Sequence, residues 1–250
     1  MLLRLGKILS LMILLTFSQI SHAQTIRLAT GEWAPYQSSA LKKDGFVTQI
    51  VVEALAREGY QVELVYMPWK RAIKEIARGG VDGSFIWTKN SEREKIFLFS
   101  DPVISLTNSL FQLNSKPIQW DKVQQLSQYR IGGLQAYSYG IEEYEKQGFL
   151  KVERIYVPEN NYKKLSLGHL DLVIENTDVG MKILHRIGMA DEISPNPKPI
   201  TVKYGHFVAP KISPKSEKLI ADFNRGLEKL KSEGKIDAYR QAARLGEYNK

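Results

Sequence analysis

The 250-residue sequence contains no cysteine, so disulfide bonds cannot hold the fold together and a hydrophobic core must stabilise it. No apolar run approaches the roughly 18 residues that a membrane-spanning helix needs. Tracts of low complexity are absent, and so are blocks of about five or six like charges. These absences exclude a disulfide-rich scaffold and favour an ordinary globular protein over an integral membrane protein.

The N-terminal segment has the three parts of a secretory signal peptide. Arg4 and Lys7 are positively charged, residues 8–17 are apolar, and a short segment with small residues ends at Ala23. A membrane-anchoring helix is the alternative, but the apolar run is short for a bilayer. The lack of cysteine also excludes a lipid-anchored export signal. We therefore expect residues 1–23 to be removed, with cleavage near Ala23 and Gln24, and the mature protein to be periplasmic.

Basic residues outnumber acidic residues. The chain has 35 lysines and arginines against 27 aspartates and glutamates, a formal net charge of +8. Loss of the two basic residues of the signal peptide lowers this charge to about +6. A basic balance raises the question of nucleic acid or anionic membrane as a partner. Because the basic residues are dispersed, we expect instead a solvated surface suited to acidic ligands or to a negatively charged envelope, and no nucleic-acid partner. We also expect a monomer.

Extended and helical patterns alternate along the chain. Apolar positions and glycine or proline breaks predict strands at residues 25–30, 61–67, 83–87, 105–113, 129–134, 152–157, 171–175 and 201–209. Helical spacing predicts helices near residues 47–55, 69–77, 138–146, 162–167, 176–188 and 213–234. Strands that alternate with helices are typical of parallel sheets covered by helices, so we predict an α/β fold.

The strand–helix pattern starts afresh after residue 113, which indicates two similar α/β lobes. The extended segments 105–113 and 201–209 are long enough to cross between them as a two-strand hinge. We predict lobe 1 from residues 24–107 and 208–250, and lobe 2 from residues 108–207. Ligands of such sheets lie beyond the carboxyl ends of the strands, where the two lobes would face each other.

The most informative stretch is residues 88–102. It follows the apolar run 85–87 and brings a hydroxyl, Thr88, and a guanidinium, Arg93, into a loop at the end of a predicted strand. Arginine can grip a carboxylate with two parallel hydrogen bonds, and a nearby hydroxyl can supply a third. Taken alone, the pattern also fits a surface arginine in a charged loop, so its meaning depends on the rest of the chain.

The whole mature chain resembles the periplasmic solute-binding proteins of the polar amino-acid type (family 3), which serve ABC importers. The most specific match is Arg93 followed by Phe-Ser-Asp-Pro at residues 99–102, because the family has an arginine before Phe-Ser-x-Pro. The resemblance implies the type II periplasmic-binding fold. It also implies that Arg93 grips the α-carboxylate of the ligand, with Thr88 as its partner.

Two further segments carry the resemblance. The family's aromatic-x-Pro-aromatic loop falls on Trp33, which would stack on the ligand, with Tyr36 beyond it. In the second lobe, residues 130–138 match a Gly-Thr-Thr-like turn whose amides, at a helix N-terminus, meet the same carboxylate. Ser138 would take the hydroxyl role there. Tyr137 precedes or enters this helix and is a further candidate for the cleft.

One position departs from the family pattern. The family has an aspartate, five residues after the aspartate of its Gly-x-x-Asp segment, that pairs with the α-ammonium of the ligand. That position is Asn176 here, and Glu175 lies just before it. An amide can accept a hydrogen bond from an ammonium but supplies no charge. Either Glu175 turns inward through a local bulge, or the ligand lacks the usual ammonium.

The remaining candidates are weaker. Arg71 opens a helix at the end of lobe 1 where ligands gather, and a second cation there would favour a doubly acidic ligand. Trp69 is interpreted as a core anchor and Trp87 as a neighbour of the core. The histidines lack the spacing of a zinc site, and no Gly-x-Ser-x-Gly elbow or phosphate loop is present. We therefore expect no catalytic residue, no metal and no cofactor.

These observations predict an extracytoplasmic protein that captures a small carboxylate-bearing ligand, an amino acid or a relative, and presents it to an ABC importer. Two alternatives stay open. An exported enzyme of the same fold, a cyclohexadienyl-dehydratase-like lyase, would use a cleft carboxylate such as Glu175 as an acid. A sensing module would present its closed form to a membrane receptor instead of a permease.

Overall fold

The computed structural model describes residues 24–135 and 137–250, and the predicted signal peptide lies outside the described residues. The strands within these ranges are β1 (Gln24–Thr30), β2 (Tyr60–Tyr66), β3 (Gly83–Trp87), β4 (Phe97–Leu113), β5 (Ile131–Leu134), β6 (Val152–Ile155), β7 (Leu172–Asn176), β8 (Ile193–Pro195) and β9 (Thr201–Pro210). The helices are α2 (Phe46–Ala56), α3 (Trp69–Ala77), α4 (Ser91–Ile96), α5 (Glu142–Lys146), α6 (Pro158–Ser166), α7 (Thr177–Ile187), α8 (Ser216–Ser232) and α9 (Lys235–Arg244), with 3-10 turns η1 (Lys42–Asp44) and η2 (Val123–Gln128).

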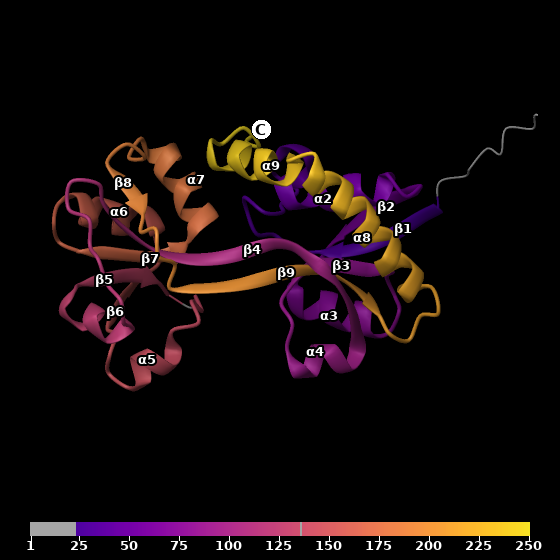
Figure 1. The fold of residues 1–250 in the computed structure, drawn as a ribbon, viewed down its shortest axis with the longest axis horizontal. Helices are drawn as coiled ribbons and strands as arrows, with labels where there is room; N and C mark the ends of the chain where they lie inside the picture. The colour runs from indigo at the N-terminus through magenta and orange to yellow at the C-terminus, as the bar shows by residue number, and fades with distance from the viewer. Residues whose placement is uncertain (1–23, 136) are drawn as a thin grey trace, which may run out of the picture.

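A single mixed sheet runs through the molecule (Figure 1). Its strand order is β2-β1-β3-β9-β4-β7-β5-β6, with β8 paired to β4. The strands β1, β2 and β3 are parallel at one end, and β5, β6 and β7 are parallel at the other. The predicted α/β class is therefore confirmed.

Two lobes are joined by the long strands β4 and β9, which cross together from one lobe to the other (Figure 1). The two strands pair antiparallel from Phe97 opposite Pro210 to Asn108 opposite Thr201. The predicted two-strand connection is confirmed, although the prediction missed the first half of β4. We use lobe 1 for β1–β3, α2–α4, α8 and α9, and lobe 2 for β5–β8 and α5–α7.

The core of lobe 1 lies around α2 and α8. Val47, Ile50, Val51 and Ala54 on α2 are fully buried, as their helical spacing predicts. Helix α8 approaches so closely that a Cβ atom at Gly226 would overlap the backbone of Ala54. Only glycine permits this contact. Two separate apolar clusters stabilise lobe 2.

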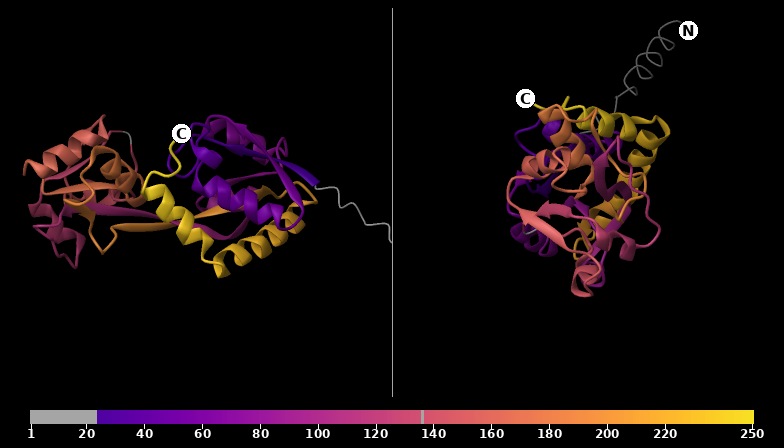
Figure 2. Two further views of the ribbon diagram at one scale, coloured as in Figure 1. Left: turned by 90° about the horizontal axis from the view of Figure 1, so that it is seen from above. Right: turned by 90° about the vertical axis from the view of Figure 1, so that its left-hand side faces the viewer.

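Helices α8 and α9 complete lobe 1, and α9 also contacts α7 of lobe 2 (Figure 2). The two lobes thus meet through α7 and α9 as well as through the hinge strands. No helix in the described part of the chain is long and apolar enough to cross a membrane.

Three local predictions were wrong in detail. Arg93 lies in the short helix α4 and not in a loop, because the side chain of Asn90 accepts a hydrogen bond from the Arg93 amide and caps that helix. The helix predicted from residue 138 begins only at Glu142, after Gly140, whose φ is +77°. The helix predicted from residue 213 begins at Ser216.

Candidate functional site

A cavity of about 570 Å³ lies between the lobes. Lobe 1 contributes Trp33, Trp69, Ile86, Trp87, Thr88 and Arg93; lobe 2 contributes Tyr137, Ser138 and Asn176; and the hinge strands contribute Leu106, Asn108 and Lys203. The volume is within the range of small-molecule sites. The lining combines indole rings, amides, hydroxyls and two cations.

Arg93 is a cation with no ion pair to any residue that the structure describes. Its Nη1 donates hydrogen bonds of 2.8 Å to the carbonyl oxygen and of 2.8 Å to the hydroxyl of Thr88, which fix the guanidinium beside the cavity. The guanidinium also lies 5.0 Å from the ring centroid of Trp87. Burial alone lowers the pKa of Arg93, and within the described residues no carboxylate oxygen lies within 4.0 Å of it. Such a group is suited to bind an anion.

Indole rings form the apolar wall of the cavity. Trp69 and Trp87 pack edge to face, with ring centroids 5.5 Å apart. Trp33 reaches across the cavity, and its Nε1 donates a 2.9 Å hydrogen bond to the hydroxyl of Tyr137 in lobe 2. Burial, together with the nearby Glu175, raises the pKa of Tyr137 to about 12, so its hydroxyl keeps its proton at neutral pH. The aromatic surfaces can hold the apolar part of a ligand.

Asn176 lies where β7 ends and α7 begins. Its Oδ1 accepts hydrogen bonds from the amide of Val179, at 3.2 Å, and from the hydroxyl of Tyr36, at 2.6 Å. The first bond caps α7, and the second joins the two lobes. Asn176 therefore lines the cavity and also supports the contact between the lobes.

Three residues expected to bind the ligand do not line the cavity. Tyr36 is fully buried, and its hydroxyl donates a hydrogen bond to Oδ1 of Asn176. Glu175 is 2% exposed, and its Oε1 accepts a 2.8 Å hydrogen bond from the amide of Asn176. Strand alternation directs the side chains of Glu175 and Asn176 to opposite faces of the sheet, so no bulge brings both to the cavity. Burial raises the pKa of Glu175 to about 7.

Arg71 is the third expected ligand-binding residue that does not line the cavity. Its side chain is 70% exposed, and its Nε lies 3.9 Å from a carboxylate oxygen of Glu75. Trp69 and Arg71 are two positions apart on α3, which places them on different faces of that helix. Only Trp69 of the pair lines the cavity.

Ser138 lines the cavity, but its surroundings differ from the expected anion-binding turn. Its hydroxyl donates a 2.7 Å hydrogen bond to Oε1 of Glu142, and the amide of Gly140 lies 3.2 Å from the same oxygen. Because Glu142 already occupies these donors and α5 begins only there, Ser138 does not lie at a helix N-terminus. Ala136, which belongs to the same turn, lies outside the described residues.

Sequence reasoning missed Lys203 and Asn108, which the hinge strands bring to the cavity. Both segments were interpreted only as connections. A strand that crosses between two lobes must turn one face toward the space between them, and that rule could have identified both polar residues. Trp69 and Trp87, interpreted mainly as core residues, also line the cavity.

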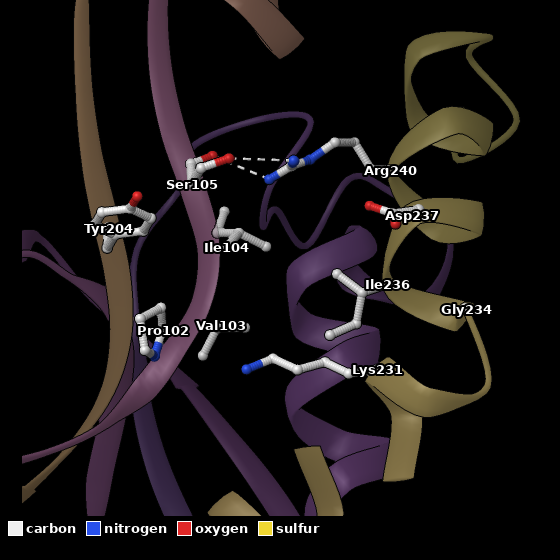
Figure 3. Close-up of a pocket in the computed structure, with 10 residues that line it drawn as sticks. All are labelled: Pro102, Val103, Ile104, Ser105, Tyr204, Lys231, Gly234, Ile236, Asp237 and Arg240. Atoms are coloured by element: carbon white, nitrogen blue, oxygen red, sulfur yellow. Dashed lines mark hydrogen bonds between the residues drawn. The ribbon is translucent and has the colours of Figure 1, made fainter. Parts of the chain in front are cut away.

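A second cavity, of about 360 Å³, lies between β4 and the turn that joins α8 to α9 (Figure 3). Ser105 and Tyr204 line it, whereas their neighbours Leu106 and Lys203 line the first cavity, so the two cavities lie on opposite faces of the hinge. The Arg240 guanidinium is directed toward Ser105 and donates a 3.0 Å hydrogen bond to its carbonyl oxygen. Since this cation is already bonded, we take the first cavity as the candidate site.

The sequence matches a known family. The family model described as bacterial extracellular solute-binding proteins, family 3, matches residues 26–242. No curated protein matches the chain.

Solved structures with the same fold are numerous. Substrate-binding domain 2 of GlnP from Lactococcus lactis, in an open conformation, has a TM-score of 0.67 at 18% identity and covers 87% of this chain and 94% of its own. AbpA from Streptococcus pneumoniae, an amino acid ABC transporter substrate-binding protein bound to L-arginine, has a TM-score of 0.58 at 21% identity. It covers 90% of this chain and 97% of its own. A histidine kinase sensor domain with similarity to periplasmic binding proteins has a TM-score of 0.59 at 18% identity. It covers 88% of this chain and 96% of its own. At these identities the likeness shows the fold alone.

Proposed function

The chain belongs to the bacterial extracellular solute-binding proteins of family 3, and from this premise we propose that it captures a small carboxylate-bearing ligand between its lobes. The observation that carries the proposal is Arg93. A partly buried guanidinium that is fixed by Thr88 and has no carboxylate partner among the described residues loses solvation without compensation. A ligand carboxylate supplies the missing charge through two parallel hydrogen bonds.

Binding would proceed from lobe 1 to lobe 2. Arg93, Thr88 and Trp33 form a preorganised surface on lobe 1 that can hold a carboxylate and an apolar group. Tyr137, Ser138 and Asn176 line the opposite wall and complete the enclosure when lobe 2 closes. Closure removes water, which strengthens the pairing of the guanidinium with the carboxylate. The closed shape is then the form that a membrane partner recognises.

We propose an ABC importer as that partner. AbpA, which shares the fold, is named as an amino acid ABC transporter substrate-binding protein. A sensing role is the second candidate, since a histidine kinase sensor domain shares the fold as well. Capture of a permease or of a receptor by the ligand-loaded periplasmic protein separates the two roles.

Binding without turnover is the function that the lining supports best. A dehydratase of this fold would need an acid within reach of the ligand. Glu175, the residue considered for that role, lies outside the lining, and its carboxylate is bonded to the backbone. Incubation with a prephenate-like compound tests this point, because product formation would favour the enzyme.

The direct test is a ligand screen of residues 24–250. Amino acids, amines, monocarboxylates and dicarboxylates are compared by thermal shift, because a specific ligand raises the unfolding midpoint by mass action. Calorimetry then measures the affinity of the best carboxylate. We expect Arg93→Ala to weaken its binding by about 2–5 kcal/mol, which is roughly 30-fold or more.

Arg71→Ala is the matched control, since it removes an exposed guanidinium that does not line the cavity. We expect it to leave the affinity unchanged. Equal affinities of the Arg93→Ala variant and the parent protein would remove Arg93 from the site and overturn the proposed function.

A further inference from the structure

The charges that line the cavity are all of one sign. Arg93 and Lys203 are cations, and none of the described lining residues is an aspartate or a glutamate. The ammonium of Lys203 has no hydrogen bond or ion pair with any described residue. Lys203 lies near the Glu142 carboxylate, which does not line the cavity. Two cations and no carboxylate among the described lining residues favour a ligand with negative charge and disfavour one with a positive group nearby.

Asn176 offers the cavity a hydrogen-bond donor. The atom facing the Val179 amide must be oxygen, because that amide can only donate. The same oxygen also accepts the hydrogen bond from Tyr36. The NH₂ group is therefore the part of Asn176 that remains for a ligand, and it can only donate. An ammonium is also only a donor, so Asn176 cannot bind one.

Tyr137 adds a second donor to the same wall. Its hydroxyl oxygen accepts the hydrogen bond from Trp33 Nε1. The phenolic proton is thereby left to donate to a ligand atom. This wall of lobe 2 thus presents an N–H and an O–H toward acceptor atoms such as carboxylate or carbonyl oxygens.

Carboxylates close to the cavity are already engaged. Glu175 accepts from the amide of Asn176, and burial favours its neutral form. Glu142 accepts from Ser138 and Gly140. Glu32, next to Trp33, accepts from the hydroxyl of Ser39 at 2.7 Å. None of the three lines the cavity, so the described cavity wall offers no carboxylate to a ligand ammonium.

The apolar part of the lining is dominated by flat rings. Trp33, Trp69 and Trp87 supply three indoles, and Ile86 and Leu106 add aliphatic contacts. Aromatic rings prefer offset or edge-to-face contacts with other planar groups. The cavity of about 570 Å³ is large enough for a ring with a short acidic side chain.

Resting on the function proposed above, we propose that the ligand is an aromatic or similarly planar carboxylate that carries no ammonium group. Its carboxylate binds Arg93 and Thr88, its ring lies among the indoles, and further acceptor atoms meet Asn176 Nδ2, the Tyr137 hydroxyl or Lys203. Free α-amino acids are therefore poor ligands of this cavity.

Matched pairs of compounds test the inference by calorimetry. Each pair contains an amino acid and its analogue without the amino group: phenylalanine with 3-phenylpropanoate, and tryptophan with indole-3-propanoate. We expect the analogue to bind at least about tenfold more tightly in each pair, equal to about 1.4 kcal/mol. Tighter binding of the amino acids, lost in Arg93→Ala, would overturn this inference while keeping the proposed function. Failure of every carboxylate in the wider screen would overturn both.

Asn176→Asp is the sharpest variant. It nearly preserves the shape of the side chain and keeps an oxygen for Val179 and Tyr36, but it replaces the NH₂ donor with a charged acceptor. We expect binding of 3-phenylpropanoate to weaken about tenfold or more and binding of phenylalanine to strengthen. Asn160→Asp, which adds the same charge at an exposed position of α6, should change neither affinity. An unchanged preference in Asn176→Asp would overturn the inference.

Lys203→Met provides a second test if the Asn176 variant does not fold. Lys203 is exposed on β9, so its replacement should leave the unfolding midpoint near that of the parent. We expect weaker binding of 3-phenylpropanoate by about threefold or more. Lys163→Met removes an exposed charge from α6 and serves as the control. Equal affinities of the Lys203 and Lys163 variants would contradict a role for Lys203.

Discussion

The two lobes meet at two places with opposite electrostatic character. At the candidate cavity, the cation Arg93 has no carboxylate partner among the described residues, and neutral hydrogen bonds join the lobes there, from Trp33 to Tyr137 and from Tyr36 to Asn176. At the α7–α9 contact, Asp178 of lobe 2 pairs with two guanidiniums of lobe 1: its carboxylate lies 2.6 Å from Arg244 Nε and 3.6 Å from Arg240 Nε.

Compensation of charge distinguishes the α7–α9 contact from the candidate site. Asp178 is only 4% exposed, so its charge is compensated mainly by the two guanidiniums and not by solvent. A buried charge with partners resists separation, since removing one partner leaves the others uncompensated. Arg93 has no carboxylate partner in the described parts of the chain, so its charge is not compensated in this way. The following predictions test this difference.

The largest effect on stability is expected at the α7–α9 contact. Asp178→Asn removes the charge that neutralises Arg240 and Arg244 and should lower the free energy of unfolding by about 3–5 kcal/mol. Chemical denaturation of both proteins measures the loss. Glu92→Gln, which breaks the exposed pair with Lys95, is the control and should cost well under about 1 kcal/mol. Equal losses in the two variants would show that Asp178 is not a stabilising contact.

Glu175 provides a buried carboxylate that lacks such compensation. Burial raises its pKa from 4.5 to about 7 in the folded protein. Below pH 4.5 both states carry the proton, so the group has no effect on stability there. Between pH 4.5 and about 7 the unfolded state releases the proton first, so stability falls as pH rises, and above pH 7 the loss is complete.

Urea denaturation at pH 5 and pH 8 should reveal this loss. Full ionisation of Glu175 should lower the free energy of unfolding by a value on the order of 3 kcal/mol. Glu175→Gln should remove most of the decrease between the two pH values and make the protein more stable than the parent at pH 8. A variant with the same decrease as the parent would show that another group titrates.

The contact across the cavity should have a smaller effect. Tyr137→Phe deletes the acceptor for Trp33 Nε1, a neutral hydrogen bond worth about 0.5–1.5 kcal/mol. We expect ligand affinity to decrease by about tenfold at most, as measured by calorimetry with the best carboxylate from the screen. A loss as large as that of Arg93→Ala would mean that the cavity depends on this contact as much as on its cation.

Arg93 itself should contribute little to stability. Arg93→Met loses the bonds to Thr88 but relieves the burial of an unpaired charge. We expect the free energy of unfolding without ligand to change by less than about 1 kcal/mol. A loss comparable to that of Asp178→Asn would show that Arg93 is a structural residue, and the contrast between the two contacts would fail.

Much of the fold could be predicted from local patterns. The apolar spacing of α2 and the alternation of strands with helices depend on neighbouring residues, and they predict the α/β class and the two crossing strands. Helix starts were less accurate, because Gly140 interrupts the helix predicted from residue 138 and a cap at Asn90 creates α4. Glycine and capping effects are short-range, yet several turn types fit the same sequence.

For the candidate site, the sequence pointed to Arg93 and Thr88 through a guanidinium and a hydroxyl after a buried strand, and to Trp33 through the family resemblance, and all three line the cavity. Only the tertiary structure decided that Lys203 joins them at the cavity and that Arg71 and Glu175 do not. It also decided that the side-chain oxygen of Asn176 accepts a hydrogen bond from Tyr36, which lies 140 positions away in the sequence. The physical reason is that the orientation of a side chain, and whether its charge or oxygen is already paired, depend on residues brought together only by folding.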